Sequence, residues 1–192
     1  CASCGAKTPH IDTSPSLINN KAEVLKQVRS KNLQRCEYKG GVYVIYKENG
    51  EDVRFRALLD KKCSEEFDMK ILGAFSQVIY DITYRYGDVV AYEKGVENSE
   101  RIRLFMENRG LDGLILSMRY PYALPDESYS MSLGLNSYFF RKPFSEIVVN
   151  RNMQVTKIRF DELTYEYDYD VAGISVIRLK SLDRVLEIGL RN

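Results

Sequence analysis

The sequence contains no tryptophan and one histidine, His10, and none of its apolar runs approaches the ~20 residues that a helix needs to cross a bilayer. A single histidine, in a stretch rich in threonine and proline, leaves Ser-His and Cys-His nucleophile pairs without a usable base. The chain also has no glycine-rich phosphate loop, no HExxH motif and no second C-x-x-C to complete a zinc site. We therefore expect no enzyme, no cofactor and no metal.

The sequence also lacks a large net charge. The chain has 28 Lys+Arg against 27 Asp+Glu, a formal charge of +1, so no overall field attracts nucleic acid. Tyrosine is abundant instead, with 14 residues, and it favours β structure. A length of 192 residues with 44% hydrophobic and 29% charged residues predicts one folded domain, placed at residues 15–192, after a short tail.

The first residues are small and polar, running from Cys1-Ala2-Ser3-Cys4-Gly5 to Thr13-Ser14-Pro15. This start resembles a bacterial lipoprotein whose signal peptide has been removed and whose first cysteine carries acyl chains. Several acyl chains hold a protein on a membrane where one is marginal. We expect residues 1–14 to be a flexible tether anchored through Cys1; a boundary that falls on a cysteine by chance is the alternative.

The next segment has helical spacing. Ser14 and Pro15 are typical of an N-cap and a first helical residue, and apolar residues then recur every three or four positions, at Leu17, Ile18, Ala22, Leu25 and Val28. The spacing predicts a helix over residues 15–31.

From Glu37 onward the period becomes two, and Glu48-Asn49-Gly50-Glu51 predicts a hairpin turn. Centring that turn on Asn49-Gly50 sorts the two strands cleanly by face. One face pairs Val42 with Ala57, Val44 with Phe55 and Tyr46 with Val53, while the other pairs Lys47 with Asp52, Ile45 with Arg54 and Tyr43 with Arg56.

The same register places Cys36 opposite Cys63, within the reach of a disulfide. A disulfide is therefore one prediction, and two reduced thiols are the other. A bulge at Gly40-Gly41 would shift the register and separate the pair.

Further alternating segments predict an antiparallel meander over the rest of the chain. The middle is ambiguous: Glu100 to Phe105 suits a strand or a helix, whereas Leu111, Leu114, Ile115 and Met118 have helical spacing that stops before Pro121. The predicted class is α+β, an incomplete antiparallel β-barrel of about 10 to 11 strands with N-terminal and middle helices over its apolar face. The remaining predicted strands are 65–72, 77–85, 88–93, 137–141, 144–149, 153–160, 163–169, 174–180 and 185–190.

Two further features invite a functional interpretation. The acidic residues Asp161, Glu162, Glu166, Asp168 and Asp170 could hold calcium or act as acid and base. They alternate with tyrosines, however, and this favours a strand that has an aromatic inner face and a solvated outer face. Phe75, in the tight link Gly73–Ser76 between two predicted strands, is expected either in solvent or folded back on a neighbour.

The pattern as a whole resembles the outer-membrane lipoprotein receptor family LolB, within the LolA/LolB superfamily. The resemblance is clearest over residues 37–85 and rests on Tyr38-Lys39-Gly40-Gly41-Val42-Tyr43-Val44-Ile45-Tyr46, Asn49-Gly50, Val53-Arg54-Phe55-Arg56-Ala57 and Met69-Lys70-Ile71-Leu72-Gly73-Ala74-Phe75-Ser76. It is weaker over 137–190 and poor over 95–135.

The resemblance implies a function. Members take the acyl chains of lipoproteins from the periplasmic carrier LolA and deliver them into the outer membrane, without catalysis. It implies a monomer on the periplasmic face of that membrane, with Phe75 at the protruding apolar position of the delivery loop and Ala74 and Ser76 in place of the flanking Pro and Gly. The implied cavity wall is Val42, Val44, Tyr46, Val53, Phe55, Ala57, Val78, Tyr80 and Ile82, with Leu114, Ile115 and Met118 from the middle helix.

Other functions stay open at this point. A structural or scaffolding lipoprotein of the same fold would have a packed interior, and a carrier would hold another hydrophobic ligand. An enzyme acting on envelope lipid or glycan would need a perturbed acid pair near Glu166 and Asp168.

Overall fold

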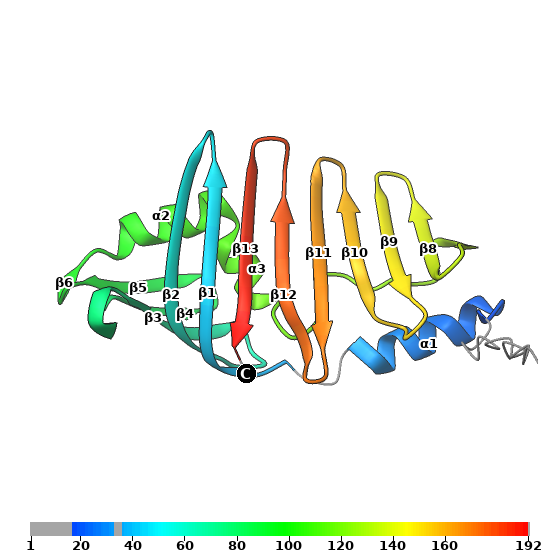
Figure 1. Ribbon diagram of the computed structural model, residues 1–192, viewed down its shortest axis with the longest axis horizontal. Coiled ribbons are helices and arrows are strands. Elements are labelled where there is room, and N and C mark those ends of the chain that lie inside the picture. Colours follow the sequence, from blue (N-terminus) through cyan, green and yellow to red (C-terminus); the bar gives the residue numbers. More distant parts are fainter. Residues whose placement is uncertain (1–16, 33–35, 192) are drawn as a thin grey trace, which may run out of the picture.

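The computed structural model describes residues 17–32 and 36–191, so Cys1, Cys4, His10, Ser14 and Pro15 lie outside the described residues. Its centre is one antiparallel sheet that curls without closing, in the order β6-β5-β4-β3-β2-β1-β13-β12-β11-β10-β9-β8-β7 (Figure 1). The strands are β1 (Tyr38–Glu48), β2 (Glu51–Lys61), β3 (Glu66–Leu72), β4 (Val78–Arg85), β5 (Asp88–Glu93), β6 (Val96–Glu97), β7 (Ser130–Leu133), β8 (Ser137–Lys142), β9 (Ser145–Asn150), β10 (Val155–Phe160), β11 (Leu163–Asp170), β12 (Gly173–Lys180) and β13 (Arg184–Arg191).

The described part of the chain thus forms 13 strands, two more than the upper end of the predicted range. The additional strands are β6 and β7, of two and four residues, which are too short to show a period of two. In the middle of the sheet, the first strand pairs with the last, Gly41↔Arg191 through Glu48↔Arg184.

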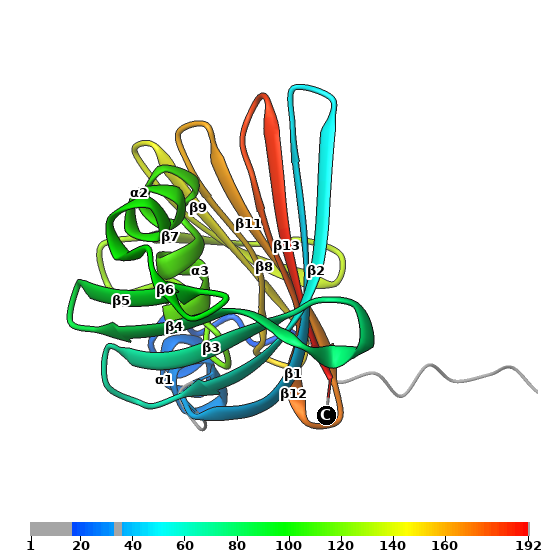
Figure 2. The ribbon, with the colours of Figure 1, turned by 90° about the vertical axis from the view of Figure 1, so that its left-hand side faces the viewer.

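Helices α1 (Lys21–Asn32), α2 (Ser99–Arg109) and α3 (Leu111–Leu116) all lie on the concave side of the sheet (Figure 2). Glu100 to Phe105 is therefore helical rather than extended. Gly110 separates α2 from α3 by adopting a left-handed φ of +64°, a conformation that glycine reaches without strain. Within the described ranges, no helix combines the length and the apolar content needed to cross a membrane.

Helix α1 begins later than predicted. Residues 17–20 are not helical, and the carboxamide oxygen of Asn20 accepts a hydrogen bond from the Glu23 amide at 3.2 Å, as an N-cap does. Upstream, the Ile18 amide donates to the Tyr138 hydroxyl at 2.8 Å, which ties this segment to β8. A tertiary contact and a competing cap therefore override the helical spacing of Leu17 and Ile18.

The β1–β2 hairpin has the predicted register, with Val42↔Ala57, Val44↔Phe55 and Tyr46↔Val53 as partners. Gly40 and Gly41 pair with Leu59 and Leu58 without a bulge, so the register continues to the open end of the hairpin. There the structure joins Cys36 and Cys63 in a disulfide, with their Cα atoms 4.9 Å apart.

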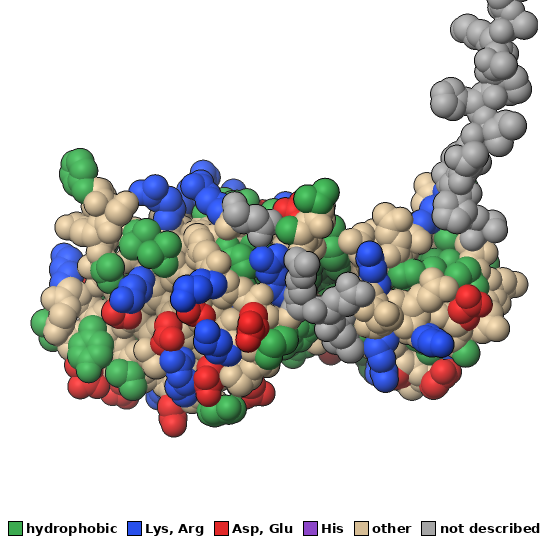
Figure 3. Space-filling view, turned by 90° about the horizontal axis from the view of Figure 1, so that it is seen from below, with side chains coloured by type: hydrophobic (Ala, Val, Ile, Leu, Met, Phe, Trp, Pro, Cys, Tyr) green, Lys and Arg blue, Asp and Glu red, His purple; other side chains and the backbone are tan. Residues whose placement is uncertain are grey.

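The core lies between the concave face and the helices. It consists of inward-facing side chains from nearly every strand together with apolar residues of α1 and of the α3 region, among them Val24, Val28, Val42, Met69, Ile82, Leu114, Ile115, Met118, Ile147, Ile158, Ile177 and Ile188. The outer face is mixed, with charged side chains beside exposed apolar ones such as Leu58 and Val90. Basic and acidic side chains are interspersed over the end formed by β3–β5 (Figure 3), where Arg85 pairs with Asp68 at 2.9 Å and Lys70 with Asp81 at 3.5 Å.

Candidate functional site

Strand β2 is longer than its neighbour β3, so part of one edge of β2 is unpaired. Strand β1 pairs with all of β2, whereas β3 pairs only with Arg56–Lys61, so that within the described chain no strand covers the other edge of residues 51–55. The link between β3 and β4 begins at Gly73, where a Cβ would overlap the Ile79 side chain. The β1–β2 hairpin stands upright, whereas the β3–β4 hairpin crosses it and points away from the helices (Figure 2).

The corner between these two hairpins holds a hollow, which we call the notch. Its volume of ≈ 830 Å³ is within the range of small-molecule sites, about 300–1,000 Å³. Strand residues form its floor and helix α2 forms one wall. The notch is lined by Tyr43, Val44, Ile45, Val53, Arg54, Phe55, Arg56, Ile71, Leu72, Gly73, Ala74, Ile79, Tyr80, Arg101 and Phe105.

The residues expected to line a cavity divide into two groups. Val44, Val53, Phe55 and Tyr80 line the notch, and of these Val44 is also a buried core residue. The structure packs the others into the core or leaves them outside it: Val42, Tyr46, Ala57, Ile82, Leu114, Ile115 and Met118 are buried core residues, and Val78 is 45% exposed.

This division has a physical reason. Side chains from α1 and the α3 region fill most of the trough, and its apolar surface stays accessible where β2 lacks a second neighbour. Val78 is displaced from the notch because the β3–β4 register shifts between Ile71 and Leu72. Ile71, Arg101 and Phe105 are site residues that sequence reasoning missed. Extending the register from Ala57 to its β3 partner Ile71 would have found the first, but nothing in the sequence orients α2.

One polar contact fixes an aromatic ring of the notch. The Tyr80 hydroxyl donates a hydrogen bond to the Glu93 carboxylate at 2.9 Å, and Asn98 donates a second at 2.9 Å. These bonds hold the pKa of Glu93 below its usual value, while the carboxylate and burial raise the pKa of Tyr80. Tyr80 thus remains neutral and keeps its ring on the notch floor.

The charged residues of the notch have one sign. Arg54, Arg56 and Arg101 line it and no carboxylate does. Arg54 makes two hydrogen bonds to Asp52, at 3.0 and 2.7 Å, and Arg101 lies 3.9 Å from Glu93. The notch is therefore an apolar surface with a basic rim.

Phe75 lies beside the notch, at the tip of the β3–β4 hairpin. It belongs to a short 3₁₀ turn, η1 (Ala74–Ser76), and its side chain is fully exposed. Both Phe75 and Ser76 adopt left-handed φ angles, +57° and +59°, which residues other than glycine seldom do. The turn therefore displays a large apolar side chain at a strained backbone position, with Ala74 joining it to the notch lining.

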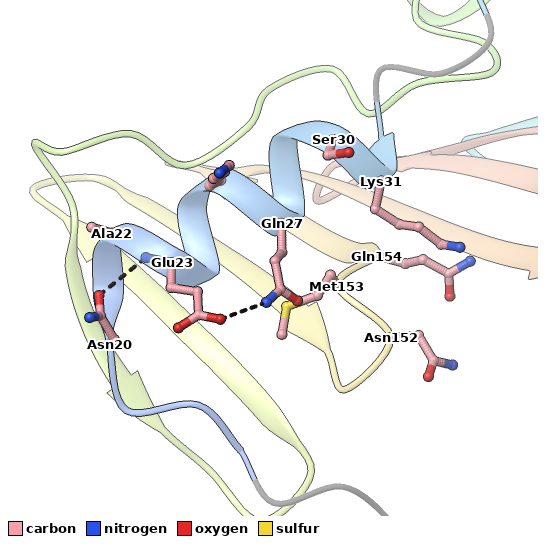
Figure 4. Close-up of a pocket in the computed structure, with 10 residues that line it drawn as sticks. Asn20, Ala22, Glu23, Gln27, Ser30, Lys31, Asn152, Met153 and Gln154 are labelled. Carbon is pink, nitrogen blue, oxygen red and sulfur yellow. Dashed lines mark hydrogen bonds between the residues drawn. The ribbon is translucent and has the colours of Figure 1, made fainter.

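A second hollow, of ≈ 950 Å³, runs along the outer side of α1 beside the β9–β10 turn (Figure 4). Its lining is mostly polar: Asn20, Glu23, Lys26, Gln27, Ser30, Lys31, Asn152 and Gln154, with Ala22 and Met153 as the apolar members. Gln27 donates to Glu23 at 3.1 Å across its surface. Such a lining does not suit hydrocarbon.

The acidic strip of β11 has the alternation that the sequence predicted. Tyr165 and Tyr167 are buried, whereas Glu166 pairs with Lys180 at 2.5 Å and Asp168 with Arg178 at 2.8 Å. Among the described residues no group of three or more acidic, cysteine or histidine side chains is arranged to hold a metal ion.

Comparisons with known proteins were made at the levels of sequence and structure. No family model matches the chain, and no curated protein matches it in sequence. A LolA superfamily protein from Nitrosomonas europaea superposes with a TM-score of 0.50 at 14% identity, over 89% of this chain and 93% of that one. A putative outer membrane lipoprotein-sorting protein domain from Vibrio parahaemolyticus gives a TM-score of 0.40 at 10% identity, over 88% and 89%. The likeness to the first concerns the fold, which in this chain is a single curved and unclosed antiparallel sheet.

Proposed function

We propose that this protein is a LolB-like acceptor, which binds the acyl chains of lipoproteins at the notch and passes them to a membrane. The observation that carries the proposal is the position of the notch: the accessible apolar surface of the trough opens directly beside the exposed Phe75. A binding surface next to an apolar tip suits a ligand that must leave the protein for a bilayer.

The shape of the notch fits transfer better than storage. Each methylene removed from water contributes about 0.8 kcal/mol, so an acyl chain gains affinity in proportion to the length that the notch covers. Because the notch is open on one side, it covers a chain only in part, whereas a bilayer covers it completely. Transfer of the acyl chain from the notch to the membrane therefore lowers the free energy, and no catalytic residue is required.

The remaining parts of the proposal concern the setting. Residues 1–14 would form a tether acylated at Cys1 and residues 15–192 one domain, held as a monomer on the periplasmic face of the outer membrane. A periplasmic LolA-like carrier would supply the cargo. Phe75 would enter the headgroup region of the membrane as a wedge, and Ala74 would lead from there into the notch.

A pair of matched substitutions tests ligand binding. Val53, on the notch floor, is 45% exposed, and Val90, on the outer face of β5, is 47% exposed. Val53→Asp places a carboxylate on the hydrocarbon path and should weaken binding of a fluorescent triacylated lipopeptide about tenfold or more, while Val90→Asp should leave it unchanged. Equal affinity of both variants and the unsubstituted protein would remove the notch from the proposal.

The packed core favours a second candidate, a structural envelope lipoprotein of the same fold. Leu114, Ile115 and Met118 leave little of the trough accessible, as a purely structural role would require. Extraction and mass spectrometry of the protein purified from membranes distinguish the two. Bound acyl lipid supports the acceptor, and its absence together with no lipopeptide binding supports the structural role.

A further inference from the structure

The basic rim of the notch carries an inference about a second class of ligand for the same hydrocarbon-binding surface, and this inference rests on the proposed function. Three arginines line the notch and differ in what they contact. Arg54 is neutralised by two hydrogen bonds to Asp52. Among the described residues, the ionic contact of Arg101 is a 3.9 Å approach to Glu93, whose carboxylate already accepts hydrogen bonds from Tyr80 and Asn98.

Arg56 is the arginine with the most capacity for a ligand. Its cross-strand partners, Tyr43 on β1 and Leu72 on β3, are uncharged, and no carboxylate in the described part of the chain forms an ion pair with it. Acidic residues elsewhere on the outer face of β2–β4 are committed to other cations: Asp52 to Arg54, Asp60 to Lys39 and Lys62, Asp68 to Arg85, and Asp81 to Lys70. The Arg56 guanidinium is exposed and retains all of its donors.

Arg56 also has the right position. It stands at the base of the notch, in the first pair that β2 makes with β3, next in sequence to Phe55 on the notch floor. Neighbouring residues of a strand point to opposite faces. The edge of β2 is uncovered at residues 51–55. The head group of a lipid whose acyl chain lies on Phe55 can therefore reach across that edge to Arg56.

We propose that the notch takes an anionic phospholipid, with one acyl chain against Val53, Phe55 and Phe105 and the phosphate on the guanidinium of Arg56. Arg101, on α2, adds a positive charge on the concave side of the notch, beside the acyl chain. Guanidinium groups bind phosphate through paired hydrogen bonds, which uncharged glycerides cannot receive.

Two lipids that differ only in the phosphate test this inference. The full chain is loaded with the uncharged dye N-phenyl-1-naphthylamine, which is then displaced by 1-palmitoyl lysophosphatidic acid or by 1-monopalmitoylglycerol, each below its micellar concentration. We expect the phosphate-bearing lipid to compete at about tenfold lower concentration, with a preference that declines as salt is raised. Arg56→Gln should reduce the preference, and Arg56→Lys should retain part of it.

Arg159→Gln is the matched control, because Arg159 is an exposed strand arginine for which the described residues provide no ion pair, and it lies on β10. Equal competition by the two lipids would overturn the inference and leave the proposed function standing, whereas failure of both lipids to displace the dye would overturn both. Displacement by inorganic phosphate alone, or an equal loss of preference in Arg159→Gln, would also overturn the assignment to Arg56.

Discussion

The phenol ring of Tyr43 on β1 lies across Gly189, its directly opposed partner on β13, in the space that a side chain there would occupy. A Cβ on Gly189 would overlap three atoms of the ring. The glycine thus lets the ring lie flat over the pairing of the first and last strands, and Tyr43 reaches the notch from this position.

We therefore expect Gly189→Ala to lower the free energy of unfolding by about 1–3 kcal/mol, because the ring must move or the strands must separate. The double substitution Tyr43→Ala/Gly189→Ala removes the overlap. In urea unfolding, its cost should be smaller than the sum of the two single costs; strict additivity would mean that the two residues do not interact.

Phe75 offers a test of membrane delivery. Phe75→Glu should lower transfer of a lipopeptide from the protein to vesicles about tenfold, since a charged tip no longer enters the headgroup region. Phe144→Glu is a close control, because Phe144 is 82% exposed in the β8–β9 turn and has a similar φ of +60°. If the two variants transfer equally, Phe75 has no special part in delivery.

The disulfide of Cys36 and Cys63 closes the open end of the β1–β2 hairpin. It also holds the Cys36 carbonyl where the buried Lys61 ammonium donates to it, at 3.0 Å. Cys36→Ala/Cys63→Ala should reduce stability by about 2–4 kcal/mol, measured by denaturant unfolding. Ligand affinity at the notch should not change, since Val53 lies about 30 Å away along the strand.

Alkaline pH should weaken the fold through the tyrosines of β11. Burial, reinforced by the nearby Tyr122, raises the pKa of Tyr165 to about 12, and burial also raises the pKa values of Tyr167 and Tyr169. In the unfolded chain these phenols ionise near pH 10. The stabilisation is complete below pH 10 and is lost as pH rises toward 12, because the unfolded state then releases protons that the folded state keeps.

Unfolding in urea between pH 8 and pH 11 measures this loss, and Tyr165→Phe should make it less steep. An identical pH dependence for that variant would show that Tyr165 does not contribute. Tyr86→Phe, at an exposed position in the β4–β5 turn, serves as the control.

Asn32 anchors the last turn of α1 to the sheet. Its buried carboxamide donates to the carbonyls of Val28 and Met153 at 2.7 and 2.6 Å and accepts from the Val155 amide at 3.2 Å. Asn32→Ala should destabilise the protein by about 1–3 kcal/mol, because buried backbone groups lose their partners. Asn152→Ala, nearby but exposed, should stay within about 0.5 kcal/mol by thermal unfolding.

The fold was predictable where a local pattern determines it. The Asn49-Gly50 turn and the two-residue period of its strands specify the β1–β2 register, which the structure confirms through to Tyr38↔Lys61. The start of α1 was not predictable, because Ile18 is hydrogen-bonded to Tyr138, a residue far along the chain. The same holds for Glu100 to Phe105, whose helical form depends on packing over β5.

The candidate site was predictable only in part. The register places Val53 and Phe55 on the inner face, but only the structure shows that α1 and the α3 region fill the trough beside Val42 and Ile82 and leave the notch open. Helix packing between distant segments leaves no signature in a single sequence. For Phe75 the sequence left two possibilities, exposure to solvent or folding back on a neighbour, and the structure shows the exposed form.

The ladder between β1 and β13 has a consequence for how the molecule is made. Every other neighbouring pair in the sheet is consecutive along the chain, so each half can begin to assemble as it emerges, but the two halves are joined only when residues 184–191 arrive. Such distant pairing slows folding. Until then β1 has a long unpaired edge rich in valine and tyrosine, which promotes aggregation. A nascent chain at this stage would need a chaperone to shield that edge.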